Sequence, residues 1–151
     1  MIWQIKTFNE LTTHELFEIL KLRSDVFVVE QNCVYPDLDE KDRHSQTHHV
    51  MLLDDHNRLM GYSRVLAPGQ SYPEASIGRV VINPDNRGNG LAQRLMQKSI
   101  AVVQQQWPDT AIQIGAQEYL TQFYQNMGFQ PISEMYLEDG IPHRDMLYLT
   151  T

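Results

Sequence analysis

The most informative stretch of this sequence is Arg87-Gly88-Asn89-Gly90-Leu91-Ala92. It follows an apolar run, Ile77 to Ile82, and opens an amphipathic segment from Leu91 to Gln106. A strand, a Gly-rich turn and a helix start in this order form an anion site, because the first amides of the helix lack partners and the helix dipole adds partial positive charge. The two glycines let the backbone approach a bound phosphate without a Cβ in the way. The sequence therefore predicts a phosphate site at this turn.

Two nucleotide-binding motifs do not fit the turn. A P-loop requires a Lys followed by Ser or Thr after its last Gly, but Gly90 is followed by Leu91 and Ala92. A Rossmann fingerprint has G-x-G-x-x-G spacing near the start of its domain. Here Gln93 stands where the third Gly is required, and the turn lies past mid-chain. The phosphate therefore belongs to another class of ligand.

Together with its flanking segments, the turn resembles the acyl-CoA pyrophosphate loop of the Gcn5-related N-acetyltransferase (GNAT) superfamily. The family pattern Gln/Arg-x-x-Gly-x-Gly/Ala fits Arg87, Gly90 and Ala92. Val80-Val81-Ile82-Asn83-Pro84 resembles the family's fourth strand, and Phe123-Tyr124-Gln125-Asn126-Met127-Gly128-Phe129 resembles its late helix. Two motifs in the family's order are more specific than either motif alone.

Three further segments narrow the resemblance to the ElaA-type branch of this superfamily. They are Arg23 to Cys33, Gly115 to Gln117 and Glu138 to His143. The resemblance thus covers nearly the whole chain. It implies an acyltransferase, and it leaves the acceptor unidentified.

Hydrophobic periodicity predicts a mixed α/β chain. A strand is expected at 2–8, followed by a helix that starts at the capping box Thr12-x-x-Glu15 and by a second short helix that ends near Glu30. Further strands are expected at 49–53, 59–66, 76–83, 111–115 and twice in the tail, and further helices at 91–106 and 118–127. The resemblance implies an α/β (α+β) GNAT fold over residues 1–151 as a single domain. Its mixed central sheet would have about seven strands, splayed between strands four and five and flanked by about four helices.

Composition limits the class of function. The net charge is -7 at pH 7, and the sequence has no Lys/Arg-rich run. It therefore lacks the clustered positive charge with which proteins bind nucleic acids. No apolar run approaches the ~20 residues that span a bilayer, and the N-terminus lacks the pattern of a signal peptide. Cys33 is the single cysteine, which excludes an intramolecular disulfide and fits a reducing compartment. We therefore expect a cytoplasmic protein without a membrane or nucleic-acid partner.

The resemblance implies acetyl-CoA (coenzyme A) as the co-substrate. In the family, a bulge in strand four frees backbone groups that pair with the pantetheine arm, and the Gly-rich turn supplies amides to the pyrophosphate. Gln117 stands where many relatives have an Asn that helps to hold the pantetheine. The cofactor-binding residues implied in this way are Val80, Val81, Ile82, Arg87, Gly88, Asn89, Gly90, Leu91, Ala92, Gln93, Gln117, Phe123 and Tyr124.

Tyr124 is the candidate catalytic acid. Attack of an amine on a thioester expels a thiolate, which leaves more easily when an acid donates a proton, and the family commonly uses a Tyr at this helix position. Tyr124 also has the spacing of a core aromatic, but a Tyr can bury its ring and still present its hydroxyl. The general base stays open, because the expected strands four and five carry no carboxylate. The candidates are Glu30, His49, Glu118, His143 and a water molecule.

A set of polar residues has two open interpretations. They could line the acceptor side of the site, or they could form a salt-bridge network that ties the early helices to the sheet. The set comprises Arg23, Glu30, Gln31, Arg64, Arg79 and His143. No metal site is predicted. An EF-hand loop that began at Asp37 would require an oxygen ligand at Lys41, Gly at Asp42 and Glu at His48. The adjacent His48 and His49 would face opposite sides of a strand.

The sequence thus predicts an acetyl-CoA-dependent N-acetyltransferase that moves an acetyl group directly to a primary amine of an unidentified small molecule or peptide. One alternative is a non-catalytic acyl-CoA-binding sensor, which the missing strand carboxylate keeps open. Another is an acyltransferase with a different donor or acceptor, such as the acyl-homoserine-lactone synthases that share the fold. Family members are often dimers, so a homodimer is one expected state.

Overall fold

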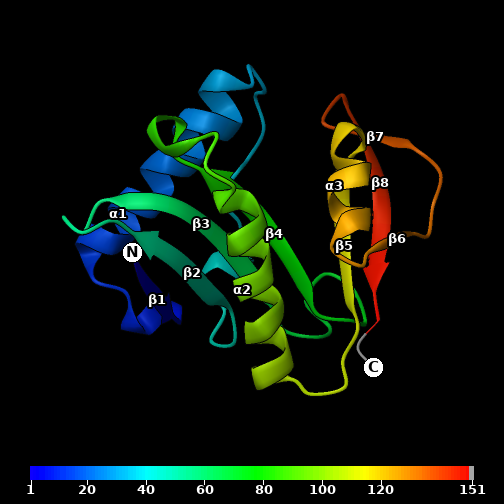
Figure 1. The fold of residues 1–151 in the computed structure, drawn as a ribbon, viewed down its shortest axis with the longest axis horizontal. Helices are drawn as coiled ribbons and strands as arrows, with labels where there is room; N and C mark the ends of the chain where they lie inside the picture. The colour runs from blue at the N-terminus through cyan, green and yellow to red at the C-terminus, as the bar shows by residue number, and fades with distance from the viewer. Residues whose placement is uncertain (150–151) are drawn as a thin grey trace.

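The computed structural model describes residues 1–149 and arranges them as two antiparallel sheets (Figure 1). The first sheet has the order β1-β2-β3-β4, in which the strands are Ile2–Lys6, His48–Leu53, Leu59–Leu66 and Ser76–Ile82. The second has the order β5-β8-β6, and β7 also pairs with β8. Its strands are β5 (Ile112–Gln117), β6 (Gln130–Pro131), β7 (Tyr136–Glu138) and β8 (Ile141–Tyr148).

The two sheets meet where β4 begins. Ala75 and Ile112 form a parallel bridge, and the Gln113 amide donates to the Ala75 carbonyl at 2.9 Å. Beyond this bridge the structure records no further β4–β5 pair within residues 1–149, and the strands diverge (Figure 1). The expected splay between strands four and five is therefore confirmed. The described part of the chain contains eight strands, one more than expected, because the tail forms three strands instead of two.

The predicted helices are present, with one change of length. Helix α1 (Thr13–Arg23) begins at the predicted capping box, in which Thr12 Oγ1 accepts from the Glu15 amide at 3.1 Å. It continues as a π-helix over Ser24–Glu30, and α2 spans Leu91–Gln106. Helix α3 is shorter than expected, at Thr121–Asn126, because Glu118–Leu120 form a tighter 3-10 turn. Within residues 1–149, no helix is both long and apolar enough to cross a membrane.

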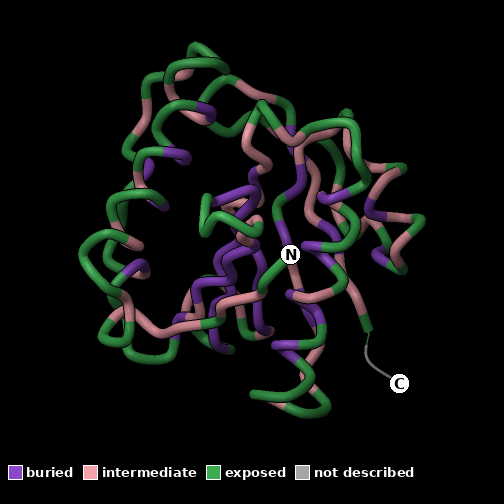
Figure 2. Tube along the Cα trace, turned by 60° about the vertical axis from the view of Figure 1, so that its left-hand side comes forward, coloured by how far each residue is buried: buried purple, intermediate pink, exposed green. Residues whose placement is uncertain are grey.

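The core lies between α2 and the strands, and Figure 2 shows buried residues along the strands and on the inner sides of the helices. Every apolar residue of the predicted α2 face is buried: Leu91, Leu95, Met96, Ile100 and Val103. The main cluster contains residues of both sheets, such as Ile77 of β4 and Ile114 of β5. Burial of this shared cluster holds the two sheets together although their backbones hydrogen-bond at only one end.

A buried ionic network fastens the segment between α1 and β2 to the first sheet. Arg23, the last residue of α1, is fully buried, and its Nε and Nη1 lie 2.9 Å from Asp37 Oδ2 and 2.7 Å from Asp42 Oδ1. Arg64 of β3 reaches the same segment, with Nη1 2.7 Å from Asp39 Oδ1 and 3.0 Å from Asp42 Oδ1. Removal of one charged partner would leave a buried charge unpaired, which would cost folding free energy. Each ion pair therefore depends on the others.

Arg79 of β4 completes the network, because its Nε lies 2.9 Å from Asp37 Oδ1. Three guanidinium groups thus face three carboxylates, and their formal charges cancel. Burial alone would raise the pKa of the Asp42 carboxyl. The hydrogen bonds and the charge of Arg23 outweigh burial and lower that pKa from 3.8 to about 2. The network is therefore a structural element that needs its carboxylates ionised.

Replacement of Asp42 tests this role. Asp42→Asn removes a buried negative charge and leaves Arg23 and Arg64 partly unpaired, so we expect a loss of about 3–5 kcal/mol in the free energy of unfolding. Because the folded-state pKa is depressed, the stabilisation from Asp42 is fully present above pH 3.8 and is lost as the pH falls toward about 2. Urea titrations of both proteins from pH 7 down to about pH 2 measure both effects. Glu40→Gln, at an exposed residue of the same segment, is the matched control. Equal stability of the two variants at pH 7 would contradict the role of the network.

Candidate functional site

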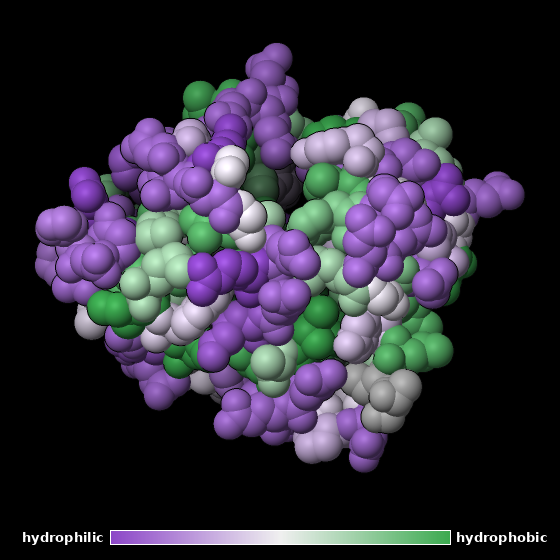
Figure 3. Space-filling view, in the orientation of Figure 1, coloured by the Kyte–Doolittle hydropathy of each residue, from purple (hydrophilic) through white to green (hydrophobic). Residues whose placement is uncertain are grey.

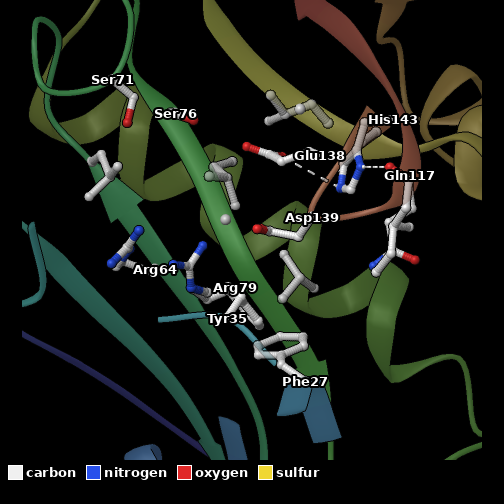
Figure 4. Close-up of a pocket in the computed structure, with 18 of the residues that line it drawn as sticks. Phe27, Tyr35, Arg64, Ser71, Ser76, Arg79, Gln117, Glu138, Asp139 and His143 are labelled. Atoms are coloured by element: carbon white, nitrogen blue, oxygen red, sulfur yellow. Dashed lines mark hydrogen bonds and ion pairs between the residues drawn. The ribbon is translucent and has the colours of Figure 1, made fainter. Parts of the chain in front are cut away.

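A cavity of about 540 Å³ occupies the gap between the diverging strands. Its walls are the β4 segment 76–80, the β5 segment 114–117, the turn between β7 and β8, and part of the segment 27–41 (Figure 4). The space-filling view shows a recess between the two halves of the molecule, each of which contains one sheet (Figure 3). Cys33 Sγ lies 3.7 Å from the Asp139 carbonyl oxygen, so the two sides also touch beside the cavity.

Strand β4 carries a bulge at the cavity wall. The pairing with β3 moves from Tyr62↔Val81 to Arg64↔Gly78, so β4 contains one extra residue between these pairs. Arg79 lies in this interval with φ 52, a left-handed conformation that non-glycine residues rarely adopt. The bulge that the resemblance implied in strand four is therefore present. Beyond the Ala75 bridge, the edge of β4 that faces β5 has no strand partner among residues 1–149.

The three apolar residues that follow the bulge point in different directions. Val80 lines the cavity, whereas Val81 is buried in the cluster beneath α1 and Ile82 packs against the core near α2. Alternation of this kind is expected in a strand. A role for Val81 and Ile82 in holding a ligand therefore depends on their backbone groups, and their side chains belong to the core.

The Gly-rich turn lies at the far end of β4 and does not line the cavity. Gly88 and Gly90 have φ values of 86 and 70, and Gly90 is the N-cap of α2. A Cβ built at either glycine would meet no atom within 4 Å, so the space above the turn is open. The left-handed backbone requires these glycines and leaves their amides at the start of α2 accessible. Leu91, by contrast, is buried with Leu52 and Met60, so only its amide is available to a ligand.

Arg87 has a protein partner in this structure. Its Nη2 and Nη1 lie 2.6 Å and 3.1 Å from the two carboxylate oxygens of Glu30, and each side chain is 44% exposed. The π-helix that follows α1 positions Glu30, so this pair links the Gly-rich turn to the segment that forms the cavity's other side. Glu30 does not line the cavity, which leaves it poorly placed as a general base.

Tyr124 of α3 lines the cavity as expected. Its ring is 8% exposed and has edge contacts with Phe123 and Phe129 at centroid distances of 5.1 and 5.8 Å. Burial, with a smaller contribution from Tyr119, raises the pKa of Tyr124 to about 12. Its hydroxyl has no hydrogen-bond partner among the described residues and remains protonated at neutral pH, as an acid must. Phe123 packs behind Tyr124 and does not line the cavity.

Two of the candidate bases are engaged elsewhere. His49 is 1% exposed, and its ring nitrogens lie 2.6 Å from the Tyr62 hydroxyl and 2.9 Å from the Asp42 carbonyl oxygen. Burial lowers the pKa of His49, so it remains neutral inside the ionic network. Glu118 forms a double hydrogen bond with Arg144, at 2.9 Å for each oxygen, and the pair lies outside the cavity.

His143 and Gln117, in contrast, line the cavity together. They are paired across β5 and β8, and Figure 4 shows both side chains on the same wall. Several polar residues were expected either to line the acceptor side or to form a salt-bridge network. Of these, Gln31 also lines the cavity. Arg23, Arg64 and Arg79 form the salt-bridge network, although Arg64 and Arg79 also border the cavity.

Sequence reasoning missed several polar groups at the site. Tyr35, Tyr72, Glu138 and Asp139 all line the cavity. The dipeptide Asp139-Gly140, with φ values of 51 and 77, forms the two-residue turn between β7 and β8. Asp-Gly between two strands is a known hairpin signal, and it could have located Glu138 and His143 on neighbouring strands. Among residues 1–149, no group of three His, Cys, Asp or Glu side chains is arranged to hold a metal ion.

Comparisons with known proteins agree with this arrangement. The acetyltransferase (GNAT) domain family matches residues 23–149. Protein ElaA of Escherichia coli (strain K12) is 40% identical over 144 residues, which cover 95% of this chain and 94% of that protein. The crystal structure of E. coli ElaA has a TM-score of 0.90 with 38% identity, and covers 98% of this chain and 99% of its own. An acyl-CoA N-acyltransferase from Pseudomonas aeruginosa has a TM-score of 0.92 with 39% identity, covering 97% of this chain and 98% of its own. This chain therefore belongs to the GNAT acetyltransferase family and is an acyltransferase of the ElaA-like branch.

Proposed function

We propose that this enzyme transfers an acetyl group from acetyl-CoA directly to a primary amine of a small molecule or peptide. The observation that supports it most is the cavity between β4 and β5, because it combines the unpaired edge of β4 with the protonated Tyr124 hydroxyl. The edge of β4 leads toward the Gly-rich turn, whose open space suits a phosphate. One continuous surface would thus hold both ends of the donor.

The residues of this surface fit coenzyme A. The backbone of Val80 to Ile82 would pair with the pantetheine amides as an added strand does. Gln117 on the opposite wall would donate or accept a further hydrogen bond. The amides of Gly88 to Gln93 would receive the pyrophosphate, with Arg87 adding positive charge. The donor supplies a thioester, whose carbonyl carbon is open to attack by an amine.

The chain's own groups then provide positioning and proton transfer. With both substrates held in the gap, the amine and the thioester meet as in an intramolecular reaction. The amine nitrogen bonds to the carbonyl carbon and loses a proton, the C–S bond breaks, and the departing sulfur takes the Tyr124 proton, which Tyr124 then regains from water. No covalent enzyme intermediate is required. Cys33 touches the cavity from its rim, and we assign it no step.

Turnover assays test this function. We expect release of free thiol from acetyl-CoA with at least one member of a panel of amines, polyamines and peptides, and saturation with both substrates. Parallel assays with longer acyl-CoA donors test the preference for acetyl. Binding of coenzyme A without turnover on any acceptor, from any donor, would favour the acyl-CoA sensor and contradict the proposal.

Replacement of Tyr124 tests the acid. Tyr124→Phe removes the hydroxyl and keeps the ring packing, so we expect kcat to fall by about 10²–10⁴-fold while coenzyme A affinity stays within about twofold. Steady-state kinetics and calorimetric titration measure the two quantities. Tyr119→Phe, at an exposed tyrosine five residues earlier, is the matched control and should retain full activity. An unchanged kcat in Tyr124→Phe would show that another group protonates the sulfur.

The pair Arg87–Glu30 gives a second test, because Glu30 competes with the pyrophosphate for the guanidinium. An exposed ion pair contributes about 0.2–1 kcal/mol, so Glu30→Gln should tighten coenzyme A binding by up to about fivefold. Arg87→Gln should weaken binding, and adding Glu30→Gln to it should then have no effect. Calorimetric titration of the four proteins at low and high salt measures this cycle. An unchanged affinity in Glu30→Gln would mean that Arg87 does not contact the donor.

A further inference from the structure

The proposed reaction needs a group that accepts a proton. A primary amine is an ammonium ion at neutral pH, and it cannot attack a carbonyl carbon until it loses a proton. Strands β4 and β5 carry no carboxylate, and Glu30, His49 and Glu118 are engaged in contacts away from the cavity. A base, if the protein supplies one, therefore has to come from another wall.

The β7–β8 hairpin brings an imidazole into that wall. His143 of β8 lies opposite Gln117 of β5 and opposite Tyr136 of β7 in the strand register. Its ring stacks on the Tyr136 ring, with centroids 6.1 Å apart and an interplanar angle of 23°. The residue is 9% exposed and lines the cavity (Figure 4). Val80 and Tyr124 line the same cavity. Packing thus fixes the ring while one edge stays accessible.

The hydrogen bonds of this ring define its tautomer. His143 Nδ1 lies 2.7 Å from the Ile141 carbonyl oxygen. A carbonyl oxygen can only accept, so Nδ1 carries the hydrogen in the neutral ring and Nε2 carries the lone pair. Nε2 lies 3.7 Å from Glu138 Oε2, on the side that faces the cavity (Figure 4). The nitrogen that carries the lone pair in the neutral ring is therefore the one on the side of Glu138 and the cavity.

The groups that surround His143 come from three neighbouring segments. Glu138 of β7 is the carboxylate beside Nε2, and Asp139 in the turn also faces the cavity. The Tyr136 hydroxyl donates a hydrogen bond to Asp145, at 2.6 Å. Strand β5 presents the uncharged Gln117. The wall around His143 thus carries negative charge, which suits an acceptor that arrives as an ammonium ion.

We infer that His143 Nε2 is the general base that deprotonates the acceptor ammonium. The inference rests on the proposed acetyl transfer. The ammonium N–H bond breaks and the Nε2–H bond forms, and the freed nitrogen lone pair bonds to the carbonyl carbon. The C–S bond breaks, the sulfur takes the Tyr124 proton, and the attacking nitrogen loses its second proton to water as the amide forms. Afterwards His143 releases its proton to water and Tyr124 regains one from water, so one proton is released per turnover.

Two substitutions separate a base from a structural residue. His143→Asn keeps an N–H donor near Nδ1 for the Ile141 carbonyl and removes the lone pair of Nε2. His143→Gln places an amide near Nε2 and removes the Nδ1 donor. For a base, both variants should lose kcat/KM by about 10²–10⁴-fold at pH 7, with coenzyme A affinity retained. Added imidazole should partly restore the His143→Asn variant. Activity of His143→Asn close to that of the unmodified enzyme would overturn the inference, because the ring would then serve only to hold the hairpin.

The pH dependence of kcat/KM provides a readout that a structural role would not change. In the unmodified enzyme kcat/KM should fall at low pH as the base takes up a proton. In His143→Asn kcat/KM should instead follow the free-amine fraction of the acceptor, so its low-pH limb should lie at higher pH. A limb at unchanged pH in His143→Asn would overturn the inference and leave the acetyl transfer standing. An unmodified enzyme without turnover on any amine would overturn both.

Discussion

Strands β4 and β5 hydrogen-bond where Ala75 meets Ile112, and the site exists because the pairing goes no further in the described chain. Continued pairing would have closed the gap with backbone hydrogen bonds. The bulge at Arg79 turns β4 away, and the shared core beneath α2 supplies the cohesion that the missing hydrogen bonds would have provided. The path of the main chain thus creates the gap, and the side chains that line the gap determine its chemistry.

The ionic network supports one wall of the cavity. Arg64 and Arg79 border the cavity, but both guanidinium groups are already paired with Asp37, Asp39 or Asp42. Their charge is therefore largely neutralised within the protein, and they support the wall. The wall across from them holds His143 and Glu138, which line the cavity. An ammonium group would find its electrostatic complement on that side.

Local patterns in the sequence predicted most of the secondary structure. Apolar alternation marked the strand Leu59–Leu66 with its observed bounds, the Thr12 capping box marked the start of α1, and the two glycines marked the start of α2. The resemblance to the family, rather than periodicity, implied the splay between the sheets. The two diverging sheets confirm the GNAT fold that the resemblance implied.

Interactions between distant segments were not predictable in the same way. Arg23, Arg64 and Arg79 are far apart in the sequence, so no spacing distinguishes their network from an acceptor site. The position of His143 depends on how β7 and β8 pair, and the sequence of β8 alone does not determine that register. Asp139-Gly140 indicates only where the turn lies. Tertiary pairing decides which histidine lines the cavity, and for this reason His49 and His143 looked equivalent in the sequence.

Amide hydrogen exchange with and without coenzyme A tests most directly whether the gap is the donor site. If it is, ligand should slow exchange at the β4 residues Val80 to Ile82 and at the turn residues Gly88 to Gln93. Exchange in β2 should not change, because β2 already pairs with β1 and β3. Protection confined to other parts of the molecule, or no protection at saturating ligand, would contradict the placement of the donor between β4 and β5.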